Sequence, residues 1–197
     1  MNKRGIEFSV GFLVGLIIAI LIFSLSLYFT LKWFGEADEI KGNIDRQTQE
    51  RIMSTLKTGN QQVGIPISVE EIKKGNMAIF GLGVRNIGSQ SEFSASVAFA
   101  AAYDESGNQL SVDDQFITTN WLGQFQTISP FTLSKNEMHI APILIKANTQ
   151  IGSGISTQKG DYVFNVCVWQ GQEQECTLAN RDNAFTKKIY QVTVRVI

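Results

Sequence analysis

The sequence has very little histidine and no recognisable catalytic pattern. His139 is the only histidine among 197 residues, and no serine or cysteine nucleophile pattern lies near it in the sequence. It falls in an alternating, strand-like stretch, where a solvent-facing position is the simplest interpretation. A single histidine also excludes the HExxH motif and any two-histidine metal set. We therefore expect a protein that is not an enzyme, with no catalytic residues, no metal site and no cofactor.

Neither sign of charge is in excess. The chain has 17 Lys and Arg against 18 Asp and Glu, a formal net charge of -1. The basic residues are scattered, so the chain has no long-range field that would attract nucleic acid. A phosphate loop is also lacking, because Phe80-Gly81-Leu82-Gly83 has no third glycine and no helical pattern after it. The sequence indicates no nucleic-acid partner and no small-molecule substrate.

Charged residues and histidine are missing altogether from residues 8–31. As a helix this run would be about 36 Å long, enough to cross a hydrocarbon core of about 30 Å. Lys3 and Arg4 precede it, and no small-x-small cleavage site follows Leu31. We expect residues 1–34 to form a basic leader and a transmembrane helix. The predicted location is the cell membrane, single-pass, with a cytoplasmic N-terminus and an extracytoplasmic C-terminal domain.

Small residues recur within this apolar run. Gly11, Gly15 and Ala19 lie four positions apart and therefore share one face of a helix. Without bulky side chains, two helix backbones can approach closely and gain van der Waals contact. We expect these three residues to pack against another helix, and the chain to self-associate through its N-terminal helix.

The two cysteines, Cys167 and Cys176, lie close together in the sequence. Between them, Gly171-Gln172 supplies the glycine that a type II′ hairpin turn requires at its first central position. In that register the cysteines face each other with Cα atoms about 4.5 Å apart, within reach of a disulfide. We expect a disulfide, which would place the domain in an oxidising compartment. Two unrelated buried thiols are the alternative.

An amphipathic pattern follows the apolar run. Ile40, Ile44, Ile52 and Leu56 recur at spacings of four or eight, which predicts a helix over 36–57. Residues 58–66 are rich in Gly, Gln and Asn and end in proline, which is typical of a boundary. The predicted division is a leader and transmembrane helix at 1–34, an amphipathic helix and linker at 35–65, and an extracytoplasmic β-sandwich at 66–197.

Strand-like runs fill the rest of the chain. They are residues 77–87, 93–103, 115–121, 137–147, 161–169 and 185–197. The last run is the clearest, since Tyr190, Val192 and Val194 alternate with polar residues. The predicted fold class is α+β: a long N-terminal helix, transmembrane and then amphipathic, followed by an antiparallel β-sandwich.

Two stretches resemble the E and F strands of immunoglobulin-like extracellular domains. They are Phe131–Ile140 and Gly160–Val166. The Gly-x-Tyr that opens the second stretch would give Tyr162 the role of the tyrosine corner in that family. The resemblance implies an immunoglobulin-like sandwich. The cysteine pair departs from the family, because it lies within one predicted hairpin and does not bridge two sheets.

The first residues resemble the leader of archaeal type IV pilins and archaellins. Lys3-Arg4-Gly5 precedes Ile6, and in that family the leader is cut after such a glycine, here between Gly5 and Ile6. The family usually has a glutamate at the fifth position after the cut, whereas Glu7 would be second. Basic residues flanking an ordinary uncleaved anchor are the alternative.

The resemblance implies a non-enzymatic, membrane-anchored cell-surface protein, a pilin-like structural subunit presenting a β-sandwich. The alternative is a membrane-anchored extracellular binding or adaptor module, similar to an envelope or archaellar-stator component, that does not form filaments. The expected partners are the membrane, further copies of the chain and, in the alternative, another surface protein.

Overall fold

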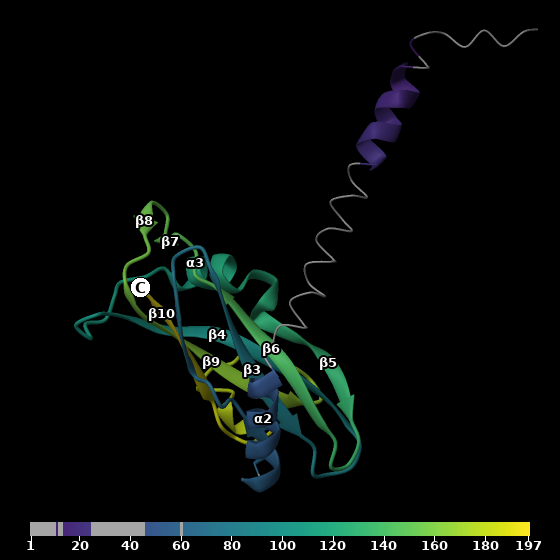
Figure 1. Ribbon diagram of the computed structural model, residues 1–197, viewed down its shortest axis with the longest axis vertical. Helices are drawn as coiled ribbons and strands as arrows, with labels where there is room; N and C mark the ends of the chain where they lie inside the picture. The colour runs from purple at the N-terminus through teal and green to yellow at the C-terminus, as the bar shows by residue number, and fades with distance from the viewer. Residues whose placement is uncertain (1–10, 12–13, 25–45, 60) are drawn as a thin grey trace, which may run out of the picture. The chain divides into compact units, whose positions relative to one another are not determined.

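The computed structural model describes residues 11, 14–24, 46–59 and 61–197 (Figure 1). The chain forms two compact units, Met1–Asn43 and Ile44–Ile197. In the first unit, residues 11 and 14–24 are helical, and their side chains are exposed. The second unit is mostly β and contains every other described element.

The structure contradicts the predicted transmembrane helix. None of the described helices is long and apolar enough to cross a membrane. The continuous helical stretch, residues 14–24, would extend only about 16 Å, against about 30 Å of hydrocarbon. The predictions of a long N-terminal helix, a membrane anchor and a single-pass location are corrected accordingly. The remainder of the predicted span lies outside the described residues.

Helix α2 (Arg46–Thr58) packs against strand β3 (Met77–Arg85) within the second unit (Figure 1). Its apolar residues Ile52 and Leu56, both part of the predicted stripe, are fully buried. They pack over Gly83, where any Cβ would collide with both side chains. The Arg85 guanidinium donates to the Leu56 carbonyl at 3.2 Å, satisfying an acceptor near the end of the helix. Ile40 and Ile44 lie outside the described residues.

Among the described residues, ten strands form three sheets. Besides β3 they are β1 (Val63–Gly64), β2 (Val69–Ile72), β4 (Ser91–Asp104), β5 (Thr127–Leu133), β6 (Met138–Lys146), β7 (Gln150–Gly152), β8 (Ile155–Ser156), β9 (Gly160–Gln170) and β10 (Tyr190–Val196). Their order is β1-β3-β6 in one sheet, β2-β10-β9-β4-β5 in the second, and β7-β8 in the third. Strand β2 is parallel to β10, and the other paired strands are antiparallel.

A continuous hydrophobic core joins the two larger sheets. It contains Phe80 and Leu82 of β3 together with Phe93 of β4 and Phe164 of β9, all fully buried. The strands lie close to the predicted runs, but three sheets with one parallel pair differ from the antiparallel immunoglobulin-like sandwich that the sequence predicts. The fold is therefore corrected to a mostly β unit that carries short helices.

Residues 115–121, predicted as a strand, are helical. They belong to α3 (Asp114–Ile117) and to a π-helical turn (Thr118–Leu122), followed by a 3-10 turn (Gly123–Gln126). The Asp113 carboxylate accepts from the Phe116 N–H at 3.0 Å and so caps the first turn. The cap and the buried Trp121 outweigh the β propensity of the intervening residues.

Candidate functional site

The outer face of the five-stranded sheet divides into two halves. Side chains that alternate with the core residues of β4, β9 and β10 lie on this face. Ser94, Ser96, Cys167 and Trp169 form the covered half, which is buried beneath residues 171–189. The other outward residues, nearer Asp161 at the start of β9, form the open half. We define these two halves as the candidate site.

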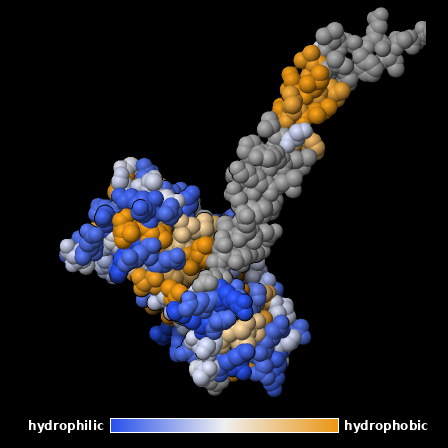
Figure 2. Space-filling view, in the orientation of Figure 1, coloured by the Kyte–Doolittle hydropathy of each residue, from blue (hydrophilic) through white to orange (hydrophobic). Residues whose placement is uncertain are grey.

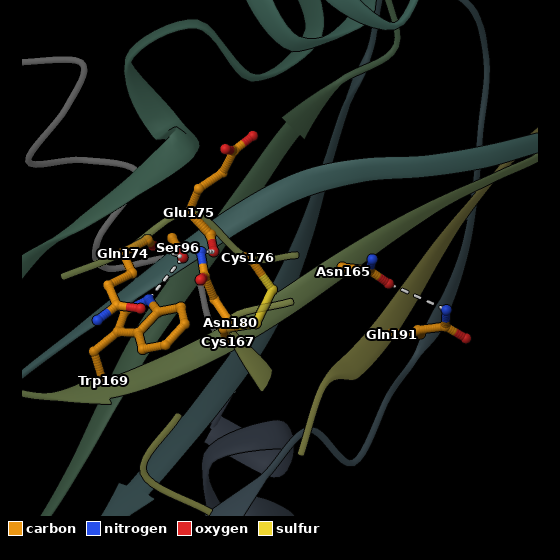
Figure 3. Close-up of a disulfide and its surroundings, with 9 residues drawn as sticks. All are labelled: Ser96, Asn165, Cys167, Trp169, Gln174, Glu175, Cys176, Asn180 and Gln191. Carbon is orange, nitrogen blue, oxygen red and sulfur yellow. Dashed lines mark hydrogen bonds between the residues drawn. A yellow bond between two sulfur atoms is a disulfide. The ribbon is translucent and has the colours of Figure 1, made fainter. Parts of the chain in front are cut away.

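The covered half is closed by a disulfide. Cys167 and Cys176 are joined, with Cα atoms 5.4 Å apart, and both are buried (Figure 3). The predicted pair is therefore present, but the predicted hairpin is wrong. Strand β4 pairs with residues 167–170 along one edge of β9, and on Val168 the carbonyl accepts from the Phe185 N–H at 2.8 Å, while residues 171–176 form no strand. The segment instead crosses the sheet face, and the disulfide fastens it there.

A hydrogen-bonded chain supports this closure (Figure 3). The Trp169 indole N–H donates to Ser96 Oγ at 2.8 Å, and Ser96 Oγ donates to the Gln174 carbonyl at 2.9 Å. Asn180 donates its amide to the Glu175 carbonyl at 3.0 Å. Hydrogen bonds thus join β4, the Trp169 indole and the covering segment. Ser94 is different, because its buried hydroxyl has no hydrogen-bond partner among the described residues.

The open half is a shallow trough whose lining combines short side chains with the longer Tyr103 and Gln191. Across β4, β9 and β10 the floor has a row with Asn165 at its centre and a row with Val163 at its centre. These rows are Ala98–Asn165–Gln191 and Ala101–Val163–Thr193. Two hollows, of about 440 and 580 Å³, share Tyr103 and Val163 in their linings, and together they are called the trough. The Gln191 amide donates to Asn165 Oδ1 at 3.1 Å (Figure 3).

Charged groups stand at both ends of the trough. At one end Arg195 donates to Asp161 through Nε (2.7 Å) and Nη2 (3.0 Å), and lies 3.5 Å from Glu71. The hydrogen bond from Arg195 holds the pKa of Asp161 below its usual value. Asp104 accepts from the side chain and backbone of Asn108, and these bonds lower its pKa too. Glu175 lines the other end. The trough therefore has acidic side chains at both ends, and at the end with Asp104 and Asp161 hydrogen bonds lower the pKa of both carboxyls.

Tyr162 has the bonding expected of a tyrosine corner. Its hydroxyl donates to the Gln158 carbonyl at 2.9 Å and accepts from the Gln158 N–H at 3.2 Å. The side chain is buried and packs 4.5 Å from the Trp121 ring, centre to centre. Burial raises the pKa of the hydroxyl, so it stays protonated and donates. The contact fixes the chain where it enters β9, the strand that carries both halves of the face.

His139 lies on β6, half-buried, with its ring stacked on Phe131 of β5 at 4.2 Å. It is therefore less exposed than the sequence predicts. Burial lowers the pKa of the imidazole, with an opposing effect from Glu137. Within the described part of the chain, no three His, Cys, Asp or Glu residues gather in a way that could hold a metal ion.

The predicted sites thus fall into separate places. Cys167, Cys176 and Tyr162 belong to β9 and its surroundings, whereas Gly11, Gly15 and Ala19 lie in the helical residues of the first unit. Gly5 and Ile6, the predicted leader cut, lie outside the described residues. Sequence reasoning missed the trough. Its signal was the short polar and small residues that alternate with the core along β9 and β10.

Comparison with known proteins adds no family. No protein-family model and no curated protein matches the chain. Among solved structures it is similar to a family 123 glycoside hydrolase from Clostridium perfringens, with a TM-score of 0.37 and 11% identity over 66% of this chain and 22% of that one. It is also similar to the Pseudomonas fluorescens alkylpurine DNA glycosylase AlkC, with a TM-score of 0.38 and 10% identity over 73% of this chain and 33% of that one. A third is the class 5 fimbriae chaperone CfaA, with a TM-score of 0.36 and 13% identity over 68% of this chain and 56% of that one. The chain spans less than two thirds of each, and likenesses this weak identify neither a fold family nor a function.

Proposed function

We propose that the chain is a non-enzymatic structural subunit that self-associates through its N-terminal helix and carries the disulfide-bonded β unit into the assembly. The observation that carries this proposal is the exposed apolar surface of residues 14–24, which Figure 2 colours as hydrophobic. Eight large side chains there are 49–64% exposed: Val14, Leu16, Ile17, Ile18, Ile20, Leu21, Ile22 and Phe23. At 100° per residue they cover every side of the helix.

A second copy of the same helix suits this surface. Burying the exposed half of each of these side chains is worth about 1 kcal/mol, or about 8 kcal/mol per helix. That gain competes with an association cost of about 4–15 kcal/mol. Two helices alone would bury only one side of each, so an apolar surface on all sides favours a bundle of several copies.

Gly15 supports close packing within such a bundle. A Cβ at this position would meet nothing within 4 Å, so the glycine leaves open space beside the helix backbone. Gly11 and Ala19 share its face. Another helix could therefore approach this face more closely than the opposite one, where Ile17 projects.

Multi-angle light scattering on the full chain in a mild detergent tests the proposal. We expect a defined oligomer that Gly15→Leu converts to smaller species, because the added side chain keeps the helix apolar but blocks close approach. Ile17→Leu, on the opposite face, is the matched control and should leave the oligomer unchanged. A full chain that remains monomeric over the accessible concentration range would refute self-association.

A further inference from the structure

We infer that the open half of the outer face binds a polypeptide segment with an apolar centre and a basic side chain at each end. This inference concerns the β unit and goes beyond the proposed assembly through the N-terminal helix. It rests on three properties of the trough: its floor, its length and the charges at its ends.

The floor suits an extended backbone. Ala98, Ala101 and Thr193 are short and Val163 is compact, so a segment could lie close to the sheet over them, with the longer side chains Tyr103 and Gln191 beside it. At one end Leu178 is 79% exposed and lines the hollow, offering apolar contact. From Cys167, below this end, to Asp161, six residue steps along β9 span about 20 Å. That length matches about six or seven residues of extended chain.

The charges favour a basic partner. Four acidic side chains line the trough, Asp104, Glu105, Asp161 and Glu175, and Arg195 is the basic residue among the described ones that line it. The charge of Arg195 is already matched by Asp161 and Glu71. Lys187 and Lys188 are exposed nearby in sequence but do not line the trough. An arriving segment therefore meets Glu175 at one end and Glu105 at the other, where Asp104 adds a negative charge although its carboxylate is hydrogen-bonded by Ser106 and Asn108.

The sheet edges offer a poorer route for a peptide. Strand addition needs a row of free backbone donors and acceptors. Edge strand β5 contains Pro130 and edge strand β6 contains Pro142, and each proline removes an N–H donor. At the edge of β3, the Ile79 N–H is already bound by the Glu70 carboxylate at 2.9 Å. Docking on the face of the sheet is the better supported mode.

Fluorescence polarisation on the full chain tests the inference with two labelled peptides, Lys-Val-Ser-Val-Ser-Val-Lys and the same sequence with Glu at both ends. We expect the lysine peptide to bind about tenfold more tightly, since each end gains a favourable charge pair and loses a repulsive one. Its affinity should fall as salt is raised. Equal binding of the two peptides, or no binding of the lysine peptide, would overturn the inference.

Two variants locate the binding. Glu105 and Glu175 are exposed, and Glu105→Lys/Glu175→Lys should weaken the lysine peptide about tenfold and reverse the preference. The control Glu50→Lys/Asp114→Lys makes the same change in net charge at exposed positions away from the trough, and should alter affinity by less than about twofold.

Ala100→Trp, at an exposed lining residue, should block the trough without touching the core. If the control pair weakens binding as much as the trough pair, or if Ala100→Trp has no effect, the site is wrong. These readouts do not depend on oligomeric state, so they can fail while the proposed assembly stands.

Discussion

The two halves of the outer sheet face are built from the same strands but differ in exposure, since one is buried and the other is open to solvent. Both are built by β4 and β9, and in both the outward side chains alternate with a continuous core. In the covered half those side chains include an indole and a disulfide sulfur, and a covering segment excludes water from them. In the open half they are small or polar apart from Tyr103 and Val163, and they are half-buried or exposed. Within one sheet, the outward residues thus decide whether a face becomes a second core or stays an accessible surface.

Trp169→Ala should break the covered half most severely. The indole is 1% exposed and its N–H is bonded to Ser96, so the change removes a large buried ring and leaves a cavity. We expect a loss of about 3–5 kcal/mol in the free energy of unfolding. Urea unfolding of the variant beside Val163→Ala, from the open half, measures the difference. A similar loss for both variants would mean that the halves are not energetically distinct.

Removing the disulfide should have the next largest effect. Cys167→Ala/Cys176→Ala opens a short loop, so the loss should be near the low end of the usual range, about 2 kcal/mol. Without the disulfide, the covered half of the sheet face should become exposed to solvent. Hydrogen exchange should show faster exchange in residues 171–189, with β10 little changed. Unaltered protection of that segment would contradict the role assigned to the disulfide.

Two neighbouring serines sharpen the comparison within the covered half. Ser96→Ala leaves the Trp169 N–H and the Gln174 carbonyl unpaired, and should cost about 1–2 kcal/mol. Ser94→Ala removes a buried hydroxyl that has no partner among the described residues, so it should be neutral or slightly stabilising. Thermal unfolding of the two variants gives the comparison. Equal destabilisation would show that Ser94 has a partner that the described residues do not supply.

The open half should give the smallest change. Arg195→Gln removes the exposed pair with Asp161, and exposed pairs contribute little. The folded-state pKa of Asp161 is lowered by Arg195, so the pair adds stability above the unfolded pKa, about 3.9, and loses it as pH falls through the lower folded value. The wild type and Arg195→Gln should therefore differ slightly near pH 7 and converge in strong acid. A gap that widens on acidification would contradict the pairing.

Much of the β unit could be predicted from local pattern. The alternation in β10 identified Val192 and Val194 as core residues, and both are fully buried. The cysteine pair was predicted correctly from an incorrect hairpin. Sequence spacing placed the two thiols close together, but it could not show that β4, over 60 residues earlier, already occupies one edge of β9.

The remaining errors have physical causes of the same kind. The apolar composition of residues 8–31 gave no information about where a helix would begin and end, and the described helix is too short to span a membrane. Residues 115–121 are rich in residues that favour strands, yet a local cap at Asp113 and the burial of Trp121 made them helical. The trough could not be predicted, because it depends on which polar rows the covering segment leaves open.

The packing of α2 over Gly83 affects how a pulling force would reach the strands of the second unit. The described part of the second unit begins with this helix, so a pulling force on the N-terminal segment would first reach the contact of Ile52 and Leu56 with β3. Strand β1, which pairs with β3, comes next along the chain. Strand β2 follows and runs parallel to β10, so the hydrogen bonds between them would be loaded together in shear. Because Gly83 leaves room for Ile52 and Leu56, the packing of α2 on β3 would be pulled apart before the force reached β2.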